Sequence, residues 1–353
     1  MELKNLRKQI DALDSHIVAL LNKRIGISSH IARKKQDTGK SVYSPDRERE
    51  VLKRISELNK GPLSGQALEA IYREVMSASL AQGASLTIAY LGPQATFSHL
   101  AALKRFGSQV KHIPCESINE VFIEVEKGNA DYGVVPIENS IEGAINYTLD
   151  MFVESDLKIC AQIILDISHN LLANCQKEKI KTVYSNPQVL GQCRAWLQEN
   201  LPKAELIEVS STTRAAQIAA KQKMSSCIAS LLAAKIYKLN IIAKSIEDSP
   251  HNITKFLVIG KTDVPKTGND KTSILFSIKD KIGALHDMLI PFKKEGINLT
   301  KIESRPSKRK AWDYYFFVDL EGHRDEPKVK KALLALEQHC KFLKILGSYP
   351  QGE

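Results

Sequence analysis

Charged side chains interrupt an apolar stripe near the start of this 353-residue chain. Leu20 and Ile27 belong to a run of hydrophobic residues at helical spacing, yet Arg24 takes the stripe position between them. Lys35 falls eleven residues after Arg24, close to three whole helical turns, so both cations share one face. A charge that faces a core is costly unless it is paired. These side chains therefore extend to solvent, form internal ion pairs or line a pocket that binds an anion.

Two further helices are predicted in residues 1–85, and both direct polar side chains toward the same interior. Ser44 is a good N-cap residue before Pro45, and Arg47 and Glu48 follow in the first turns of that helix. The third helix carries two polar residues on one face. These are Ser79 and Gln82. Cations and amides without an adjacent nucleophile suit catalysis that orients a bound substrate and stabilises negative charge as it develops on that substrate.

Arg7 indicates a second copy of the chain. It precedes Arg24 by 17 residues, which is about 25 Å along one helix. The two guanidinium groups can therefore reach one small ligand only across an antiparallel dimer. A long helix that buries only one stripe also needs a partner, so we expect a homodimer or a higher even oligomer.

Hydroxyl and amide side chains gather at four junctions between predicted strands and helices farther along the chain. Each junction alone is an ordinary helix cap or polar turn. Together they predict a polar cleft between two lobes. The junctions are residues 92–99, 135–143, 184–193 and 252–256.

Three kinds of periodicity divide the chain into three predicted domains. Residues 1–85 are helical throughout, and residues 86–262 alternate short apolar strands with helices, as in a two-lobed α/β domain. Residues 263–271 are a polar linker with proline and glycine. Residues 272–350 follow the order β-α-β-β-α-β of a ferredoxin-like α+β domain. The fold class is thus multidomain, with an all-α arm, an α/β domain and an α+β domain.

Composition excludes several classes of protein. Hydrophobic residues make up 43 % and charged residues 25 %, which predicts folded domains rather than disorder. No apolar run approaches the about 18 residues of a membrane span, and the charged N-terminus is not a secretory signal. The net charge of +10 includes no long basic run, so it favours a solvated surface, then small anionic ligands, over binding to nucleic acid. Six cysteines without a C-x-x-C pair fit reduced thiols in the cytoplasm. We expect no metal and no cofactor.

The N-terminal segment resembles the all-helical class of chorismate mutase. The resemblance is carried by L-R-x-x-I-D-x-L-D over residues 6–14, by the two stripe cations and by the run P-D-R-E-R-E. It implies that Arg7 of one protomer joins residues of the other around chorismate, with four catalytic side chains and three further contacts. The catalytic set is Arg24, Lys35, Arg47 and Glu48, and the further contacts are Ser44, Ser79 and Gln82. Ser44 stands where the family commonly has an acid.

Residues 86–262 resemble prephenate dehydratase. The resemblance implies that Thr254 lines the active site. The ring hydroxyl needs a proton as it leaves, and the Thr254 hydroxyl is the best donor, with a relay through bound water as the alternative. It implies prephenate contacts at Glu138, Asn139, Ser185, Gln192 and Lys255. Lys255 replaces the arginine of the family's Thr-Arg-Phe signature, and Ala95 replaces a usual glycine.

The C-terminal segment resembles the ACT regulatory module attached to prephenate dehydratases. Its two signatures are Gly-Ala-Leu-His at residues 283–286 and Glu-Ser-Arg-Pro at residues 303–306. The resemblance implies that phenylalanine binds between subunits and inhibits the enzyme. The allosteric residues it implies are Gly283, Ala284, Leu285, Asn298, Leu299, Glu303, Ser304 and Arg305.

The whole chain thus resembles bifunctional chorismate mutase/prephenate dehydratases with phenylalanine feedback. Two alternatives stay open at this point. One is an arogenate dehydratase with a mutase domain, since that substrate differs only in carrying an amino acid side chain. The other is a non-catalytic two-lobed sensor of small molecules with a helical dimerisation arm, which the inward cations oppose.

Overall fold

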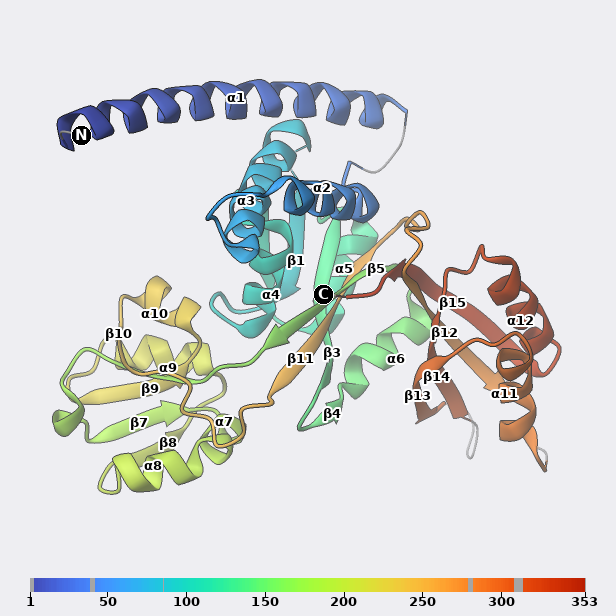
Figure 1. Cartoon of the computed structure of the whole chain (residues 1–353). Helices are drawn as coiled ribbons and strands as arrows, with labels where there is room; N and C mark the ends of the chain where they lie inside the picture. The colour runs from blue at the N-terminus through green and yellow to red at the C-terminus, as the bar shows by residue number, and fades with distance from the viewer. Residues whose placement is uncertain (1–2, 39–41, 85, 279–281, 308–313, 353) are drawn as a thin grey trace. The chain divides into compact units, whose positions relative to one another are not determined.

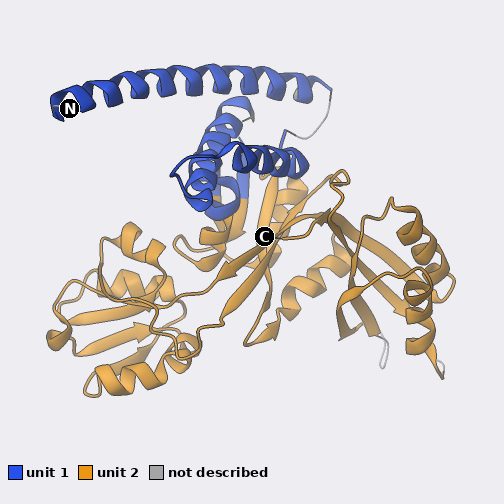
Figure 2. Ribbon diagram, viewed as in Figure 1, with its two compact units in different colours: residues 1–88, 103–112 blue, residues 89–102, 113–353 orange. Residues whose placement is uncertain are grey.

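The computed structural model describes residues 3–38, 42–84, 86–278, 282–307 and 314–352. The chain forms two compact units, shown in different colours in Figure 2. Unit 1 contains Met1–Ile88 and Leu103–His112, and unit 2 contains Ala89–Ala102 and Ile113–Glu353. The boundary passes through three elements, which are β1 (Thr87–Leu91), α4 (Phe97–Phe106) and β2 (Lys111–Cys115).

Most of unit 1 is formed by the three predicted helices. They are α1 (Leu3–Asp37), α2 (Pro45–Leu58) and α3 (Gly65–Ala84). Ser44 is the N-cap residue of α2 and Pro45 begins the helix, as predicted. Helices α1 and α3 approach closely at Gly83, where an added Cβ would lie 2.5 Å from the Cβ of Ala32. Glycine at this position therefore lets the two backbones meet.

The apolar stripe of α1 is uncovered in the single chain. Its large hydrophobic side chains are between 41 % and 66 % exposed. An isolated stripe of this length is unusual on a soluble surface, because such faces normally pack against another element. The exposed residues of the stripe are Leu6, Ile10, Leu13, Ile17, Leu20, Ile27 and Ile31.

The α/β part of the chain contains two sheets, as the two-lobed prediction requires (Figure 1). The first has the order β2-β1-β3-β11-β5, and the short strand β4 pairs with β3. The second has the order β10-β6-β9-β7-β8. The strands not yet bounded are β3 (Tyr132–Asn139), β4 (Gly143–Ala144), β5 (Lys158–Asp166), β6 (Asn170–Ala173), β7 (Thr182–Ser185), β8 (Glu205–Glu208), β9 (Ser225–Ala229), β10 (Asn240–Ala243) and β11 (Ile253–Gly260).

Helices connect these strands. The sequence favours one helix over residues 187–199, whereas the structure has two helices there, separated at Cys193. The helices of this part are α5 (Ile118–Lys127), α6 (Asn146–Glu154), the 3₁₀ turn η1 (Lys177–Lys179), α7 (Pro187–Gln192), α8 (Arg194–Asn200), α9 (Thr212–Ala219) and α10 (Leu231–Tyr237).

The C-terminal domain has the predicted order β-α-β-β-α-β. Its sheet order is β13-β14-β12-β15, which is the ferredoxin-like arrangement, and Figure 1 shows both helices on one face of the sheet. The elements are β12 (Asp270–Ile278), α11 (Ala284–Lys294), β13 (Leu299–Pro306), β14 (Tyr314–Glu321), α12 (Pro327–Glu337) and β15 (Cys340–Pro350). The predicted start of β14 at residues 311–313 lies outside the described residues.

The C-terminal domain shares a hydrophobic core with the first sheet of the α/β part. One buried cluster joins Phe152 and Ile159 to Phe317 and Leu346 of the C-terminal sheet. Strand β15 lies so close to β5 that a Cβ on Gly347 would be 2.3 Å from the carbonyl oxygen of Ile159. The two domains are therefore packed as one body through this contact.

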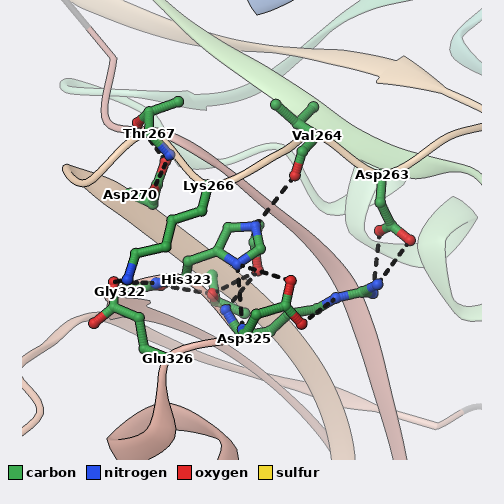
Figure 3. Close-up of polar contacts among 12 residues, drawn as sticks. Asp263, Val264, Lys266, Thr267, Asp270, Gly322, His323, Asp325 and Glu326 are labelled. Atoms are coloured by element: carbon green, nitrogen blue, oxygen red, sulfur yellow. Dashed lines mark hydrogen bonds and ion pairs between the residues drawn. The ribbon is translucent and has the colours of Figure 1, made fainter. Parts of the chain in front are cut away.

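The predicted linker is held by polar contacts. It ends at residue 269, two residues earlier than predicted, because Asp270 already begins β12. Figure 3 shows the contacts. Arg324 donates two hydrogen bonds to the carboxylate of Asp263, at 3.1 and 2.9 Å. The buried ring of His323 lies 3.1 Å through Nε2 from the carbonyl oxygen of Val264. Residues 263–269 are thus fixed against the C-terminal domain rather than left as an independent tether.

Candidate functional site

A cavity of about 600 Å³ lies within unit 1. It is strongly cationic, and Glu48 is its one carboxylate among the residues that the structure describes. Apolar side chains from α1, α2, α3 and α4 and from the segment before α2 complete the wall. Such a lining suits a small, partly apolar molecule with more than one negative charge. The cationic residues of the wall are Lys23, Arg24, Lys35, Arg47, Arg54, Arg73 and Arg105.

Two of the predicted cations are aimed by hydrogen bonds within this cavity. Arg24 donates through Nη1 to Oγ of Ser79 at 3.1 Å. The ammonium of Lys35 donates to Oγ of Ser44 and, at 3.3 Å, to the carbonyl oxygen of Val42. Burial lowers the pKa of Arg24. A partly desolvated cation of this kind gains energy when an anion enters.

The other predicted residues of this site divide into two groups. Arg47 and Glu48 line the cavity, where Glu48 lies 3.2 Å from Arg105 and Arg47 forms an exposed ion pair with Glu50. Arg7 and Gln82 are exposed and do not line the cavity of their own chain.

Sequence reasoning missed three arginines of the cavity wall. They are Arg54, Arg73 and Arg105. Arg105 also donates from Nε to the hydroxyl of Tyr43 at 2.6 Å. It comes from a helix beyond the predicted arm, so spacing along residues 1–85 could not reveal it.

A chain of hydrogen bonds links the ends of β3 and β11 to the second sheet. Asn139 and Thr254 are paired across the two strands, and Asn139 Nδ2 donates to Thr254 Oγ1 at 2.8 Å. The same amide donates to Asn252 Oδ1 at 2.8 Å, and Asn252 Nδ2 donates to Gln192 Oε1 at 3.1 Å. Thus three of the predicted residues meet, together with Asn252, the first residue of the predicted junction at residues 252–256.

The orientation of Asn139 leaves the hydroxyl hydrogen of Thr254 available. Asn139 Oδ1 accepts from the backbone N–H groups of Ile141 and Glu142 at 2.9 and 3.1 Å, which fixes its amide nitrogen toward Thr254. Thr254 Oγ1 is therefore the acceptor in that bond. No acceptor for its own hydrogen is found among the described residues. The side chain is a ready proton donor held in place by its oxygen.

His169 lies at the far end of this series of hydrogen bonds, and sequence reasoning missed it. Its Nε2 lies 2.8 Å from Gln192 Oε1, so Nε2 carries the hydrogen and donates. Burial lowers its pKa, which keeps the ring neutral near pH 7. The polar pair His169 and Asn170 between two apolar runs was the available signal.

Glu138 and Lys255 are not in this chain of hydrogen bonds. They are paired with each other on β3 and β11, one position from Asn139 and Thr254. Successive strand residues point to opposite faces, so Glu138 and Lys255 lie behind the pair Asn139–Thr254. Lys255 Nζ is 3.3 Å from Glu138 Oε1 on that far face. The expectation that both line the same site as Thr254 therefore needs correction.

Ser185 and Ala95 have separate local roles. Ser185 is fully buried and donates to the carbonyl oxygen of Ile228 at 2.9 Å. Ala95 has a φ of 73°, the left-handed region that favours glycine. This explains why a glycine is usual there. The buried methyl group of Ala95 packs in the core of the second lobe, which offsets part of the strain.

Comparison with known proteins shows which protein family these two sites belong to. Family models match for Chorismate mutase type II over residues 6–83, Prephenate dehydratase over residues 88–264 and the ACT domain over residues 272–338. A bifunctional chorismate mutase/prephenate dehydratase of Aquifex aeolicus (strain VF5) is 52 % identical over 99 % of this chain and 98 % of that protein. The chain belongs to the bifunctional chorismate mutase/prephenate dehydratase family. It has chorismate mutase and prephenate dehydratase activities and acts in phenylalanine biosynthesis.

Relatives that match a smaller share of the chain are similar to its dehydratase part. Arogenate dehydratase 2 of Petunia hybrida is 36 % identical over 76 % of this chain and 73 % of that protein. The crystal structure of a prephenate dehydratase from Arthrobacter aurescens in complex with L-Phe has a TM-score of 0.70 at 32 % identity, covering 75 % of this chain and 90 % of that one. The nearly complete match to a bifunctional enzyme therefore decides against the two alternatives raised from the sequence.

The predicted allosteric residues lie at two ends of the ACT domain. Gly283 is the N-cap residue of α11, with a φ of 79°, and Ala284 and Leu285 begin the helix. Asn298 and Leu299 follow the other end of α11. The residues at the end of β13 are Glu303, Ser304 and Arg305, and Arg305 Nη2 lies 3.5 Å from Asp150 of α6.

In the described part of the chain, no helix is long and apolar enough to span a bilayer.

Proposed function

We propose that Thr254 is the proton donor of the dehydratase. The carbon–carbon bond to the departing carboxylate breaks, its electron pair enters the ring, and the ring hydroxyl leaves as hydroxide. Thr254 Oγ1 gives its proton to that hydroxide, forming water, and solvent then reprotonates Oγ1. The observation that supports this is the bond from Asn139 Nδ2 to Thr254 Oγ1, which stabilises negative charge on that oxygen and leaves its hydrogen free.

The rest of the hydrogen-bond chain holds this donor in place. Gln192 accepts from both Asn252 and His169, so the orientation of each amide is determined by its neighbour. All members of the chain are neutral. Such a preorganised network suits a reaction in which charge develops at one hydroxyl.

We further propose that the cavity of unit 1 holds chorismate in the compact conformer from which it rearranges. Arg24 and Lys35 bind its carboxylates or the breaking ether oxygen, and Arg47 and Glu48 complete the wall. Ser44 and Ser79 aim the two cations through the hydrogen bonds described above. The cavity volume of about 600 Å³ is sufficient for a ligand of this size.

The exposed stripe of α1 supports our proposal that a second copy of the chain covers it. Burial of seven large aliphatic side chains favours association, at about 25 cal/mol per Å² of apolar surface. An antiparallel α1 would bring Arg7 of the partner toward a cavity that its own Arg7 does not line. The active unit of the mutase is then an even oligomer.

We propose that phenylalanine inhibits the enzyme by binding between two ACT domains. The backbone N–H groups in the first turn of α11 have no partner within the helix and suit its carboxylate. Helix α11 has 11 residues and is about 16 Å long, so Gly283 and Asn298 are too far apart to hold one amino acid within a single copy. Leu285 and Ile302 are about half exposed, which gives a second copy apolar surface to cover.

Gly283→Val should abolish feedback while leaving turnover intact. Valine is strained at a φ of 79°, so the start of α11 must rearrange and lose its carboxylate contact. In a coupled assay from chorismate to phenylpyruvate, the wild type should be inhibited by added phenylalanine and the variant should not. Gly268→Val is the matched control, because Gly268 has a similar φ of 92° outside α11. Equal inhibition of Gly283→Val and wild type would refute the assignment.

We also propose a cytoplasmic location. All six cysteines are free thiols. Burial raises the pKa of Cys160 and of Cys227 to about 12, so these thiols stay protonated and unreactive.

A further inference from the structure

A lysine of the ACT domain binds the dehydratase strand that carries Asn139. Lys301 Nζ of β13 lies 2.8 Å from Glu138 Oε2. Lys255 Nζ of β11 lies 3.3 Å from the other oxygen, Glu138 Oε1. The side chains of Lys301 and Glu138 are 19 % and 28 % exposed, so this contact is better shielded from solvent than a surface ion pair. Glu138 is thus shared between two lysines from two domains.

This shared carboxylate lies directly behind the proposed proton donor. The register pairs Lys255 with Glu138 and, one step along, Thr254 with Asn139. Glu138 is the chain neighbour of Asn139, whose amide holds Thr254 Oγ1, so a shift of the strand at Glu138 would also shift that amide. An error of about 1 Å in such an arrangement can cost about 100-fold in rate.

Strand β13 makes a second contact of the same kind. Arg305 is four residues after Lys301 and therefore on the same strand face, and it pairs with Asp150 of α6. The cavity beside Glu138 and Lys301 has a volume of only about 30 Å³. Ligand sites usually exceed about 300 Å³, so this region is a joint between domains and not a binding site.

We propose that Lys301 is a positioning residue for the dehydratase reaction, holding Glu138 and, through it, the strand ends that align Asn139 with Thr254. The inference rests on the proposed role of Thr254. It makes the ACT domain a part of the dehydratase site even without phenylalanine. It also gives β13 two functions, since its end carries predicted phenylalanine-binding residues while its inner face holds the catalytic strand.

Lys301→Gln is the test, with prephenate as substrate and the full-length enzyme. We expect kcat to fall about 10-fold with KM little changed, since the variant loosens alignment rather than substrate contact. Lys301→Arg keeps a cation within reach of Glu138 and should restore most of kcat. Lys330→Gln is the matched control. Lys330 is exposed on α12, and its substitution removes the same charge from the same domain.

The pH profile distinguishes positioning from a loss of stability. Burial opposes ionisation of Glu138, but Lys301 and Lys255 outweigh it and lower the pKa of that carboxyl. The other titratable groups that line the joint are Asp319 of β14, which pairs with Lys271, and Tyr349 of β15. Without Lys301 the pKa of Glu138 rises. In the plot of kcat against pH, the fall in kcat on the acid side should therefore begin at a higher pH. The melting temperature is recorded alongside.

Two results would overturn the proposal. One is a Lys301→Gln enzyme whose kcat, and whose fall in kcat on the acid side, match those of the wild type. The other is a Lys330→Gln control that loses as much activity as Lys301→Gln, which would assign the effect to overall charge. Thr254→Ala is assayed in parallel. If that variant retains turnover, the proposed proton donor fails, whereas a normal Lys301→Gln beside an inactive Thr254→Ala refutes the positioning role alone.

Discussion

Thr254→Ala should lower kcat for prephenate dehydration by about 100-fold or more, because the leaving hydroxide then lacks its proton donor. The KM for prephenate should change much less, since Asn139 and Gln192 keep their mutual alignment through Asn252. Formation of phenylpyruvate from added prephenate gives both constants.

Thr254→Ser is the matched control for this variant. Serine keeps the hydroxyl and its bond from Asn139, and loses only a methyl group, so it should retain much of the wild-type kcat. The mutase activity of both variants should be normal, because its cavity lies in the other unit. An alanine variant with normal kcat and a raised KM would show that Thr254 contacts the substrate without giving it a proton.

Arg24→Ala should reduce prephenate formation from chorismate by about 100- to 1000-fold, the usual cost of removing one preorganised donor to developing charge. Arg24 is aimed into the cavity by Ser79 and is already partly desolvated, so water cannot replace it well. The same variant should convert added prephenate at the wild-type rate. Near-normal mutase activity would mean that the cavity is not the mutase site.

The dimer can be tested by complementation. Arg7→Ala alone should also lose mutase activity, although Arg7 does not line the cavity of its own chain. Mixing the Arg7→Ala and Arg24→Ala chains gives heterodimers with one intact site, so random assortment restores about a quarter of the wild-type activity. Verified heterodimers without any recovery would place Arg7 outside the site.

The fold was predictable wherever periodicity was strong. The long helix α1, the helix start at Ser44-Pro45 and the order of the C-terminal elements all followed from spacing and caps. The strands that were missed, such as β6 (Asn170–Ala173) and β9 (Ser225–Ala229), are short and buried on both faces. Without alternation of polar and apolar residues, they carry no strand period to detect.

The residue types of the candidate site were predictable from the sequence. Which of these residues lie on the same face of the strands was not. Asn139 and Thr254 share a face, whereas their sequence neighbours Glu138 and Lys255 share the opposite one. The sequence shows both pairs as adjacent polar residues. Strand register decides which pair faces the hydroxyl and amide chain, and register depends on partners more than a hundred residues away.

The shared core has a consequence for the design of feedback-resistant enzymes. Removing an ACT module from a chain is a direct way to abolish inhibition, but here Phe317 and Leu346 cover Phe152 and Ile159. A chain cut at residue 271 would expose those two side chains to water, at about 2 kcal/mol for each. It would also leave the edge strand β5 without β15. We therefore expect truncation at this point to favour aggregation, whereas point substitutions that spare this interface should remove inhibition from a folded enzyme.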